Sequence, residues 1–474
     1  MALRGRRARW AAGGLAAALA VTVLPGVRPH SAPRPLTSPG LLGSATLPGA
    51  RAPIDPAPAA RSGYLPGTSV LALPGGQARL IPPGGTEPMT LPVRDPRVTA
   101  AVTADRAWLA SGRIPGGTPY ERTAAARALM DLRLLTAPNG ASLASWAPHW
   151  KHVWPRDAAF AVAALSATGH RVEARRILTF LATVQAPDGL WTARYQPDGT
   201  PVTDGRSAQL DAIGWVMWGA WYYDVTAPRS GPGTARALWP MVARAADLAA
   251  SLVGPDGLPP VSSDYWERDP ATETHPRLPT LGVAAPLRTG LRAAADLAKR
   301  AGHSGRGDAW GRAAERLDGA IRRDFAPYGY PRQPAAGSPP DSAVTFLAPP
   351  FAPRSAGVLR AVRRTGDRLR TPWGGVLPGA NWPGSRVEAW TPETAMFALA
   401  TTAAGDRSAG APWTGWLLRH RTAFGAFPER VDDHGRPASV APLGWTSAIM
   451  LLTLTAERHA LPIPPVPRTT PGTR

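Results

Sequence analysis

Apolar residues recur with helical spacing along most of the chain. Seven of them between residues 235 and 252 fall on one stripe: Leu238, Met241, Val242, Ala245, Leu248, Ala249 and Leu252. Residues 305–325 repeat this 3.6-residue period, which is typical of a helix with one buried face. The segment 158–167 is instead apolar on every side, which predicts a helix buried all round. Buried and amphipathic helices are therefore expected to alternate.

The pattern predicts about twelve helices, near residues 120–136, 157–169, 171–186, 207–225, 234–253, 279–302, 305–325, 342–348, 353–365, 390–404, 410–422 and 444–459. Twelve helices that are alternately inner and outer are what a ring of six helical hairpins requires. The predicted fold class is therefore all-α, an (α/α)6 toroid over residues 97–460, with a short β-like segment on its N-terminal side.

The segments between these helices also alternate in character. Five are long and rich in glycine, proline and aromatic residues: 137–156, 188–206, 254–278, 366–389 and 425–443. Long loops within a compact domain are usually functional. In a helical toroid we expect them to gather at one end and to form the walls of a pocket.

The regions outside the helical pattern predict an exported protein. Basic residues precede an apolar run at 10–24, which is shorter than the roughly 20 residues that a spanning helix needs. Residues 1–26 are therefore expected to be a signal peptide, or a signal anchor that tethers the chain to the outer face of the cell membrane. Residues 27–66 are proline-rich and predict a stalk, residues 67–96 a β-like segment, and residues 461–474 a disordered tail.

Composition and charge exclude some classes of function. The 474 residues include no cysteine, which excludes disulfides, thiolate metal sites and a cysteine nucleophile. The net charge of +20 would suit a nucleic-acid partner. Nearly all of the positive charge is arginine, however, and it is spread along predicted outer helices such as 171–186 and 305–325. We interpret it as solvated helix surface and expect no nucleic-acid partner.

The first candidate site is the run Trp154-Pro155-Arg156-Asp157, at the end of a long loop. An adjacent guanidinium and carboxylate offer donors and acceptors to sugar hydroxyls, and tryptophan offers a flat face to a sugar ring. The alternative is that Asp157 is a first-turn acid of the following helix, with Arg156 as its ion-pair partner.

Two glutamates in other long loops are candidates for proton transfer. Glu267 follows Trp266, and an indole that desolvates a carboxyl group disfavours its charged form, as a general acid requires. Arg268 would work against this unless it points away. Glu429 ends a loop ahead of the last buried helix and could activate water as a general base. Taken singly, each glutamate is equally well explained as a charged loop residue.

Together, in order and spacing, these three clusters resemble the catalytic domain of glucoamylase-type inverting α-glucosidases, glycoside hydrolase family 15. The resemblance runs from about residue 120 to 456. It includes Pro442-Leu443-Gly444-Trp445-Thr446-Ser447 after Glu429, and the stretch 209–214, which is similar to the second inner helix of the family. The family fold is an (α/α)6 toroid, in agreement with the helix count.

The resemblance implies roles for individual residues. Trp154, Arg156 and Asp157 would hold the terminal glucose, with Trp266 and Trp445 as further substrate-binding residues. Glu267 would protonate the glycosidic oxygen, and Glu429 would deprotonate a water on the opposite face of the sugar. Such inverting pairs stand roughly 6.5–9.5 Å apart. The implied enzyme is an exo-acting hydrolase that releases glucose from α-glucosides or α-glucans and needs no metal or organic cofactor.

Several alternatives stay open. Arg268 occupies the position where fungal members carry a second acid, so the substrate is less defined than the reaction. A trehalase of the same fold, or a carbohydrate-binding protein without turnover, would share the scaffold. Trp382 and Arg386 are either pocket residues or loop anchors, and Glu388 and Glu393 are expected to be helix-start acids. Linkage preference and oligomeric state are not determined by these motifs.

Overall fold

The computed structural model describes residues 61–81, 88–228 and 234–466. The predicted signal segment 1–26 and nearly all of the predicted stalk lie outside these residues, so both stay predictions, as does export. Within the described part of the chain, no helix has the length and apolar character needed to cross a membrane.

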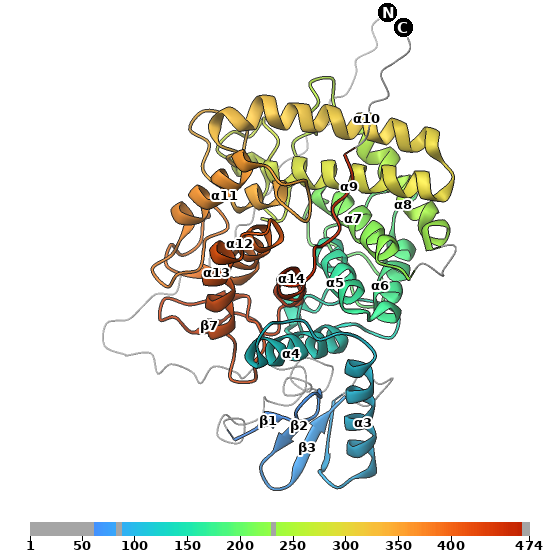
Figure 1. Ribbon diagram of the computed structural model, residues 1–474, viewed down its shortest axis with the longest axis vertical. Helices are drawn as coiled ribbons and strands as arrows, with labels where there is room; N and C mark the ends of the chain where they lie inside the picture. The colour runs from blue at the N-terminus through green and yellow to red at the C-terminus, as the bar shows by residue number, and fades with distance from the viewer. Residues whose placement is uncertain (1–60, 82–87, 229–233, 467–474) are drawn as a thin grey trace, which may run out of the picture. The chain divides into compact units, whose positions relative to one another are not determined.

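Six elements form an inner ring and are buried almost throughout. They are α5 (Pro155–Thr168), α7 (Asp211–Val225), α9 (Leu281–Ala301), the 3-10 helix η5 (Ser342–Leu347), α12 (Thr391–Ala403) and α14 (Gly444–Ala456). Each contacts the next, and α14 contacts α5, so the ring closes (Figure 1). Most of these segments are apolar on every side, as helices that pack against neighbours all round are expected to be. Helix α9 is the exception, since it carries Arg288 and Arg292, which pair with Asp318.

Six further helices alternate with the inner elements along the chain and lie outside them. They are α4 (Pro119–Leu135), α6 (Arg171–Val184), α8 (Thr234–Ser251), α10 (Ser304–Ala320), α11 (Ala356–Leu369) and α13 (Arg407–Arg419). A single π turn, Ile321–Phe325, extends α10. The predicted all-α (α/α)6 toroid is confirmed. The inner element η5 is a 3-10 helix of only six residues. Asp341 caps its start, and Pro349 and Pro350, which follow its end, prevent it from continuing as a helix.

Close approach of the inner elements depends on residues without side chains. A Cβ atom on Gly214 of α7 would lie 2.1 Å from the carbonyl oxygen of Pro286 in α9, and a Cβ on Gly290 would lie 2.6 Å from Gly214 Cα. Large aromatic side chains fill the inside of the ring, where the rings of Trp215 and Phe351 lie 4.9 Å apart. The ring interior is therefore a packed core below the loops.

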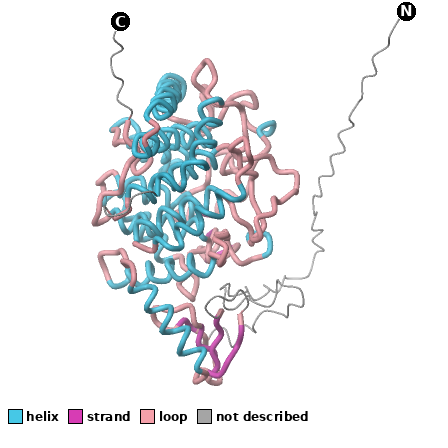
Figure 2. The backbone as a smooth tube through the Cα atoms, turned by 90° about the vertical axis from the view of Figure 1, so that its right-hand side faces the viewer, coloured by secondary structure: helices cyan, strands magenta, loops and turns pink. Residues whose placement is uncertain are grey.

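A small sheet and a helix precede the toroid. Strands β1 (Gly63–Tyr64), β2 (Leu71–Leu73), β3 (Gln77–Leu80) and β4 (Met89–Pro92) form an antiparallel meander, followed by α3 (Pro96–Ala110) (Figure 2). Strand β1 lies within the range 27–66 that was predicted as stalk, so regular structure begins earlier than predicted. Helix α3 is not among the twelve predicted helices, because its apolar residues, several of them alanine, are spread around the helix and do not stand out as one stripe. Its local signal was Asp95 as N-cap with Pro96 at the first position.

The segment predicted as a C-terminal tail begins with six described residues, which have no regular secondary structure. Leu461 and Pro464 are buried against the toroid, whereas Pro465 and Val466 are exposed, and residues 467–474 lie outside the described part. Apolar side chains among the prolines stabilise this packing by removing their surface from water.

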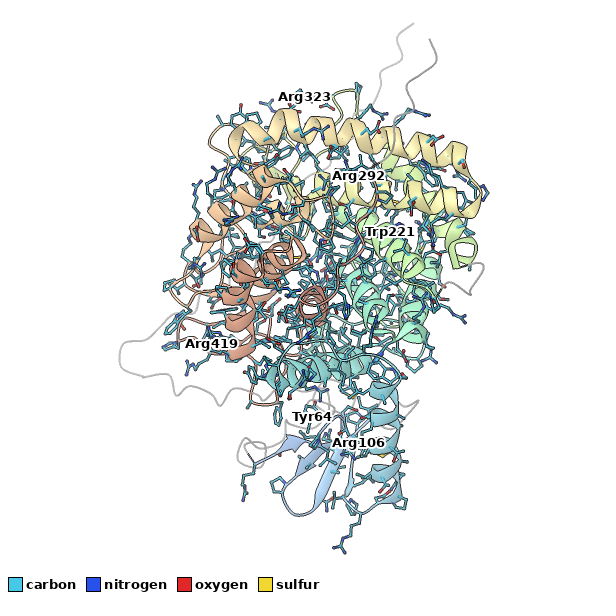
Figure 3. All side chains as sticks on the ribbon, viewed as in Figure 1. Tyr64, Arg106, Trp221, Arg292, Arg323 and Arg419 are labelled. Atoms are coloured by element: carbon cyan, nitrogen blue, oxygen red, sulfur yellow. The ribbon has the colours of Figure 1, made fainter. Side chains whose placement is uncertain are left out.

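Arginines lie both on the surface and in the interior of the fold. Figure 3 labels Arg106 on α3, Arg323 in the π turn and Arg419 at the end of α13, three separate and exposed positions. Others are buried and paired, as Arg292 is with Asp318 at 3.2 Å.

Candidate active site

The loops that precede the inner elements enclose a cavity of about 610 Å³, which is within the usual size range for small-molecule sites. All seven site residues predicted from the sequence line it: Trp154, Arg156, Asp157, Trp266, Glu267, Glu429 and Trp445. The three motifs, which are up to 275 positions apart in the sequence, are therefore brought to one place by closure of the ring.

Arg156 and Asp157 lie in the first turn of α5. The Arg156 Nε atom is 3.1 Å from Asp157 Oδ1, and Nη1 donates to Gln209 Oε1 at 2.7 Å. The guanidinium also lies 4.8 Å from the ring centroid of Trp445. Burial raises the pKa of Asp157 to about 6, although Arg156 favours the charged form. The ion-pair interpretation and the sugar-binding interpretation are thus compatible, since the pair is fixed by Gln209 and faces the cavity.

Glu267 lies at the end of a tight turn that is held by Asp264. The Asp264 side chain accepts hydrogen bonds from Trp266 N at 3.0 Å and Thr280 Oγ1 at 2.7 Å, and its carbonyl accepts from Glu267 N at 2.8 Å. Glu267 has φ of 56°, in the left-handed region that residues other than glycine rarely adopt. The turn therefore directs this side chain into the cavity at a cost in backbone strain.

A buried ion cluster supports this turn from below. Arg332 pairs with Asp264 at 3.1 Å, Glu273 at 2.6 Å and Asp341 at 3.0 Å. Its guanidinium also lies 3.7 Å from the ring centroid of Trp266. No local motif in the sequence indicates this cluster, because its members come from two different loops: Asp264 and Glu273 from 254–278, and Arg332 and Asp341 from the segment ahead of η5.

The Glu267 carboxylate has contacts that the sequence did not predict. Trp154 Nε1 donates to Oε1, and Arg206 Nη1 forms an ion pair with Oε2. Arg268, the neighbour considered from the sequence, instead donates to Thr272 O at 2.9 Å and so points away. Two cations therefore lie beside Glu267: Arg206 from the 188–206 loop, and Arg156, whose Nη2 atom is 4.0 Å from Oε1. Asp204 of the same loop pairs with Arg206 at 3.3 Å.

Glu429 is held by a small three-stranded sheet of β5 (Ala389–Trp390), β6 (Arg430–Val431) and β7 (Pro437–Ala438). Its Oε1 accepts from Trp150 Nε1 at 3.0 Å, and its Oε2 accepts from Ser439 Oγ. Burial raises the pKa of Glu429, and the two donors partly offset this by stabilising the anion. Trp150 lies in the long loop 137–156, just ahead of the first sequence motif, but Ser439 had no local signal.

Of the remaining sequence candidates, two line the cavity and two have other contacts. Trp382 lines the cavity, whereas Arg386 donates to Ala380 O and anchors its own loop. Glu388 precedes α12 and pairs with Arg430 at 2.7 Å, outside the helix. Glu393 is in the first turn of α12, as predicted, but it also lines the cavity.

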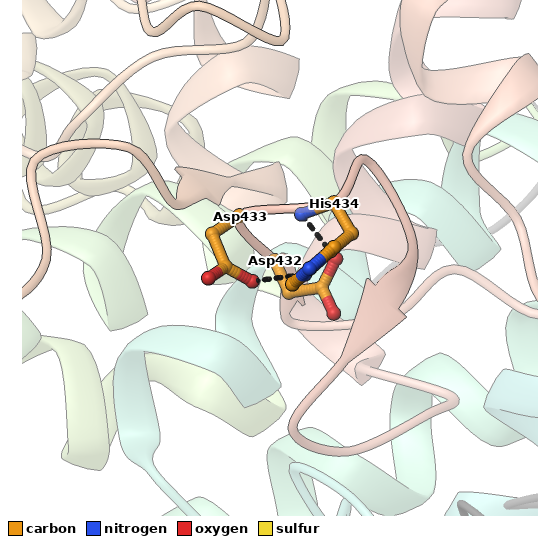
Figure 4. A group of neighbouring side chains, drawn as sticks. All are labelled: Asp432, Asp433 and His434. Atoms are coloured by element: carbon orange, nitrogen blue, oxygen red, sulfur yellow. Dashed lines mark hydrogen bonds and ion pairs between the residues drawn. The ribbon is translucent and has the colours of Figure 1, made fainter. Parts of the chain in front are cut away.

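One cluster of ionisable side chains in the described residues has the spacing of metal ligands: Asp432, Asp433 and His434 (Figure 4). The Asp432 carboxylate accepts from the backbone N–H of His434 at 3.0 Å and of Arg436 at 2.9 Å. These bonds stabilise the turn between β6 and β7. Asp433 and His434 are exposed, and the cluster has the contacts of an ordinary β-turn.

Comparison with known proteins relates this fold to glycosidases. No protein-family model matches the chain. An uncharacterized glycosyl hydrolase of Methanocaldococcus jannaschii is 34% identical over 94 residues, which make up 19% of this chain and 15% of that protein. The match thus spans well under a fifth of the curated relative's length.

Solved structures match over much more of the chain. A wild-type glycosidase has a TM-score of 0.60 at 17% identity, covering 71% of this chain and 97% of its own. A bacterial glucoamylase complexed with acarbose has a TM-score of 0.61 at 16% identity, covering 78% and 60%. The glucoamylase from Saccharomycopsis fibuligera has a TM-score of 0.58 at 14% identity, covering 73% and 96%. The chain therefore has the fold of glycosidases and glucoamylases, and the predicted resemblance is confirmed at that level.

Proposed function

We propose that this protein is an inverting, exo-acting glycoside hydrolase that releases glucose from α-glucosides or α-glucans. The observation that carries the proposal is the meeting of Glu267 and Glu429, from loops far apart in the sequence, at one cavity that also contains Arg156 and Asp157. A binding protein would need neither glutamate.

In the proposed mechanism, Arg156 and Asp157 hold hydroxyls of the terminal sugar, and tryptophan rings pack against its faces. Glu267 donates a proton to the glycosidic oxygen as the bond to the anomeric carbon breaks. Glu429, as the anion, removes a proton from the attacking water. Trp150 and Ser439 support this role because both donate to the Glu429 carboxylate and favour its charged form.

Proton NMR of maltose, maltotetraose, isomaltose and trehalose tests the proposal. We expect β-glucose to appear first from an α-linked substrate, since a single displacement inverts the anomeric carbon. Glu267→Gln and Glu429→Gln should each lower kcat about 10²–10⁴-fold, because each removes a proton-transfer group. Glu173→Gln, in the first turn of α6 and outside the cavity, is the matched control and should retain activity.

Other outcomes would replace the proposal. Turnover of trehalose alone would assign the fold a trehalase activity. If the wild type binds a sugar but hydrolyses none, the protein is a carbohydrate-binding protein with this fold. First release of α-glucose would exclude the inverting mechanism.

A further inference from the structure

A third glutamate at the cavity has no role in the mechanism above. Glu393 is at the third position of α12, and it is buried, with a relative exposure of 4%. It lines the same cavity as Glu429 and Arg156. Its buried Oε2 atom has no hydrogen-bond partner among the described residues. A buried polar atom left unpaired in this way is costly, and in a folded protein it needs an explanation.

The surroundings of Glu393 indicate which form of the carboxyl group they favour. Charged groups face it from three neighbouring segments: Glu429 ahead of β6, Asp341 at the start of η5 and Arg156 in α5. Two are acids and one is a base that is already paired with Asp157. Burial, with Glu429 and Asp341 adding to it, raises the pKa of Glu393 to about 8.

A neutral carboxylic acid can donate one hydrogen bond and accept others, which matches a sugar hydroxyl. We propose that Glu393 is a further substrate-binding residue, whose neutral carboxyl group hydrogen-bonds to a hydroxyl of the sugar held between Arg156–Asp157 and Glu429. This inference rests on the proposed function only in taking the ligand to be a sugar. A sugar hydroxyl would then give Glu393 Oε2 the partner that no described residue supplies.

The inference predicts how affinity depends on pH. Ionisation of Glu393 removes its only donor and places a second negative charge near Glu429, so sugar affinity should fall as pH rises through about 8. Calorimetric titration with maltose in a Glu267→Gln background separates binding from turnover. Between about pH 7 and about pH 9.5, affinity should fall about tenfold, the value of one hydrogen bond.

Two double variants identify the group responsible. Glu267→Gln with Glu393→Gln cannot ionise at this position, so its maltose affinity should stay constant within about twofold over the same range, since amide and acid have the same shape. Glu267→Gln with Glu457→Gln is the matched control. Glu457 also has a pKa raised by burial, to about 7, but it follows α14 outside the cavity lining, so its loss should leave the decline unchanged.

The outcomes separate this inference from the proposed function. An equal decline in maltose affinity in the variants with and without Glu393 would show that another group titrates, and it would overturn the inference. Hydrolysis by the wild type would still support the proposed function in that case. If maltose affinity declines with pH only when Glu393 is present, but the wild type hydrolyses no sugar, the inference stands and the proposed hydrolase function is wrong. Absence of sugar binding in every variant, each folded by circular dichroism, would overturn both.

Discussion

At the scale of single residues, the two candidate catalytic glutamates are held by different means. Glu267 has a left-handed backbone, with Asp264 fixing the turn and Arg332 fixing Asp264. Glu429 extends from a short strand and accepts two side-chain hydrogen bonds. The arrangement around Glu267 determines the direction of its side chain, and the arrangement around Glu429 stabilises its carboxylate anion.

Ser439→Ala tests the second arrangement. Ser439 Oγ donates to Glu429, which favours the charged form and lowers the pKa, so its loss should raise the pKa of Glu429 further. A general base works as the anion, and the acidic limb of kcat/KM should therefore move to higher pH. Activity should fall up to about tenfold on that limb and be retained above it.

The pH profile of kcat/KM on maltose is the measurement. Ser408→Ala, at an exposed hydroxyl in the first turn of α13, is the control and should leave the profile in place. A uniform loss of activity at every pH in Ser439→Ala would indicate displaced geometry instead of a changed titration.

At the scale of elements, the inner ring depends on how closely its helices approach. Helices α7 and α9 meet through Gly214 and Gly290, where backbone atoms of one helix occupy the space that a Cβ on the other would need. Both helices begin at the loops of the cavity: Asp211 at the start of α7 lies 3.3 Å from Arg156. Their spacing is thus linked to the position of the sugar-binding pair.

Gly214→Ala should therefore destabilise the fold. The new methyl group would meet the Pro286 carbonyl at 2.1 Å, and backbone cannot move aside as a flexible side chain can. We expect a loss of about 3 kcal/mol in the free energy of unfolding. Gly319→Ala in α10 is the matched control, because its Cβ would meet nothing within 4 Å, and it should raise stability by up to about 1 kcal/mol.

Denaturant unfolding followed by circular dichroism measures both variants. Equal stability of Gly214→Ala and the wild type would mean that α7 and α9 are further apart than described.

At the scale of the whole molecule, the N-terminal sheet is joined to the toroid close to the loop that carries Glu429. Arg127 of α4 donates to Thr68 O at 3.0 Å and lies 3.9 Å from the ring centroid of Tyr64. Tyr64 in turn packs edge-to-face on Phe424 at 6.0 Å. Phe424 is five residues ahead of Glu429, so the sheet packs against the loop that presents the candidate base.

Phe424→Ala should weaken both regions at once. Loss of the ring from its contacts with Tyr64 and Leu71 should reduce stability by roughly 2–4 kcal/mol. Because the loop would lose its packing, kcat should also fall, with little change in KM. Val93→Ala, at a side chain 40% exposed beside the sheet, is the control and should change neither quantity.

Thermal unfolding and initial rates on maltose test this coupling. A drop in melting temperature with an unchanged kcat would show that the sheet stabilises the fold without influencing Glu429.

The sequence by itself determined the ring of hairpins and the main polar residues of the site. Helical period and all-round apolarity are properties of contiguous residues, so the alternation of inner and outer helices was readable before any contact was known. Trp154-Pro155-Arg156-Asp157, Trp266-Glu267 and Glu429 were ambiguous singly. They indicated one site only through the resemblance of their order and spacing to the glucoamylase family.

Only the tertiary structure decided which groups surround those residues. Glu267 pairs with Arg206, 61 positions away, and with Arg156, but not with the adjacent Arg268. Trp150 likewise reaches Glu429 across 279 positions. Glu393 is a helix-start acid by its position, but it faces the cavity because ring closure turns the first turn of α12 inward. Such pairings depend on where distant loops meet, and no local pattern of residues encodes that meeting.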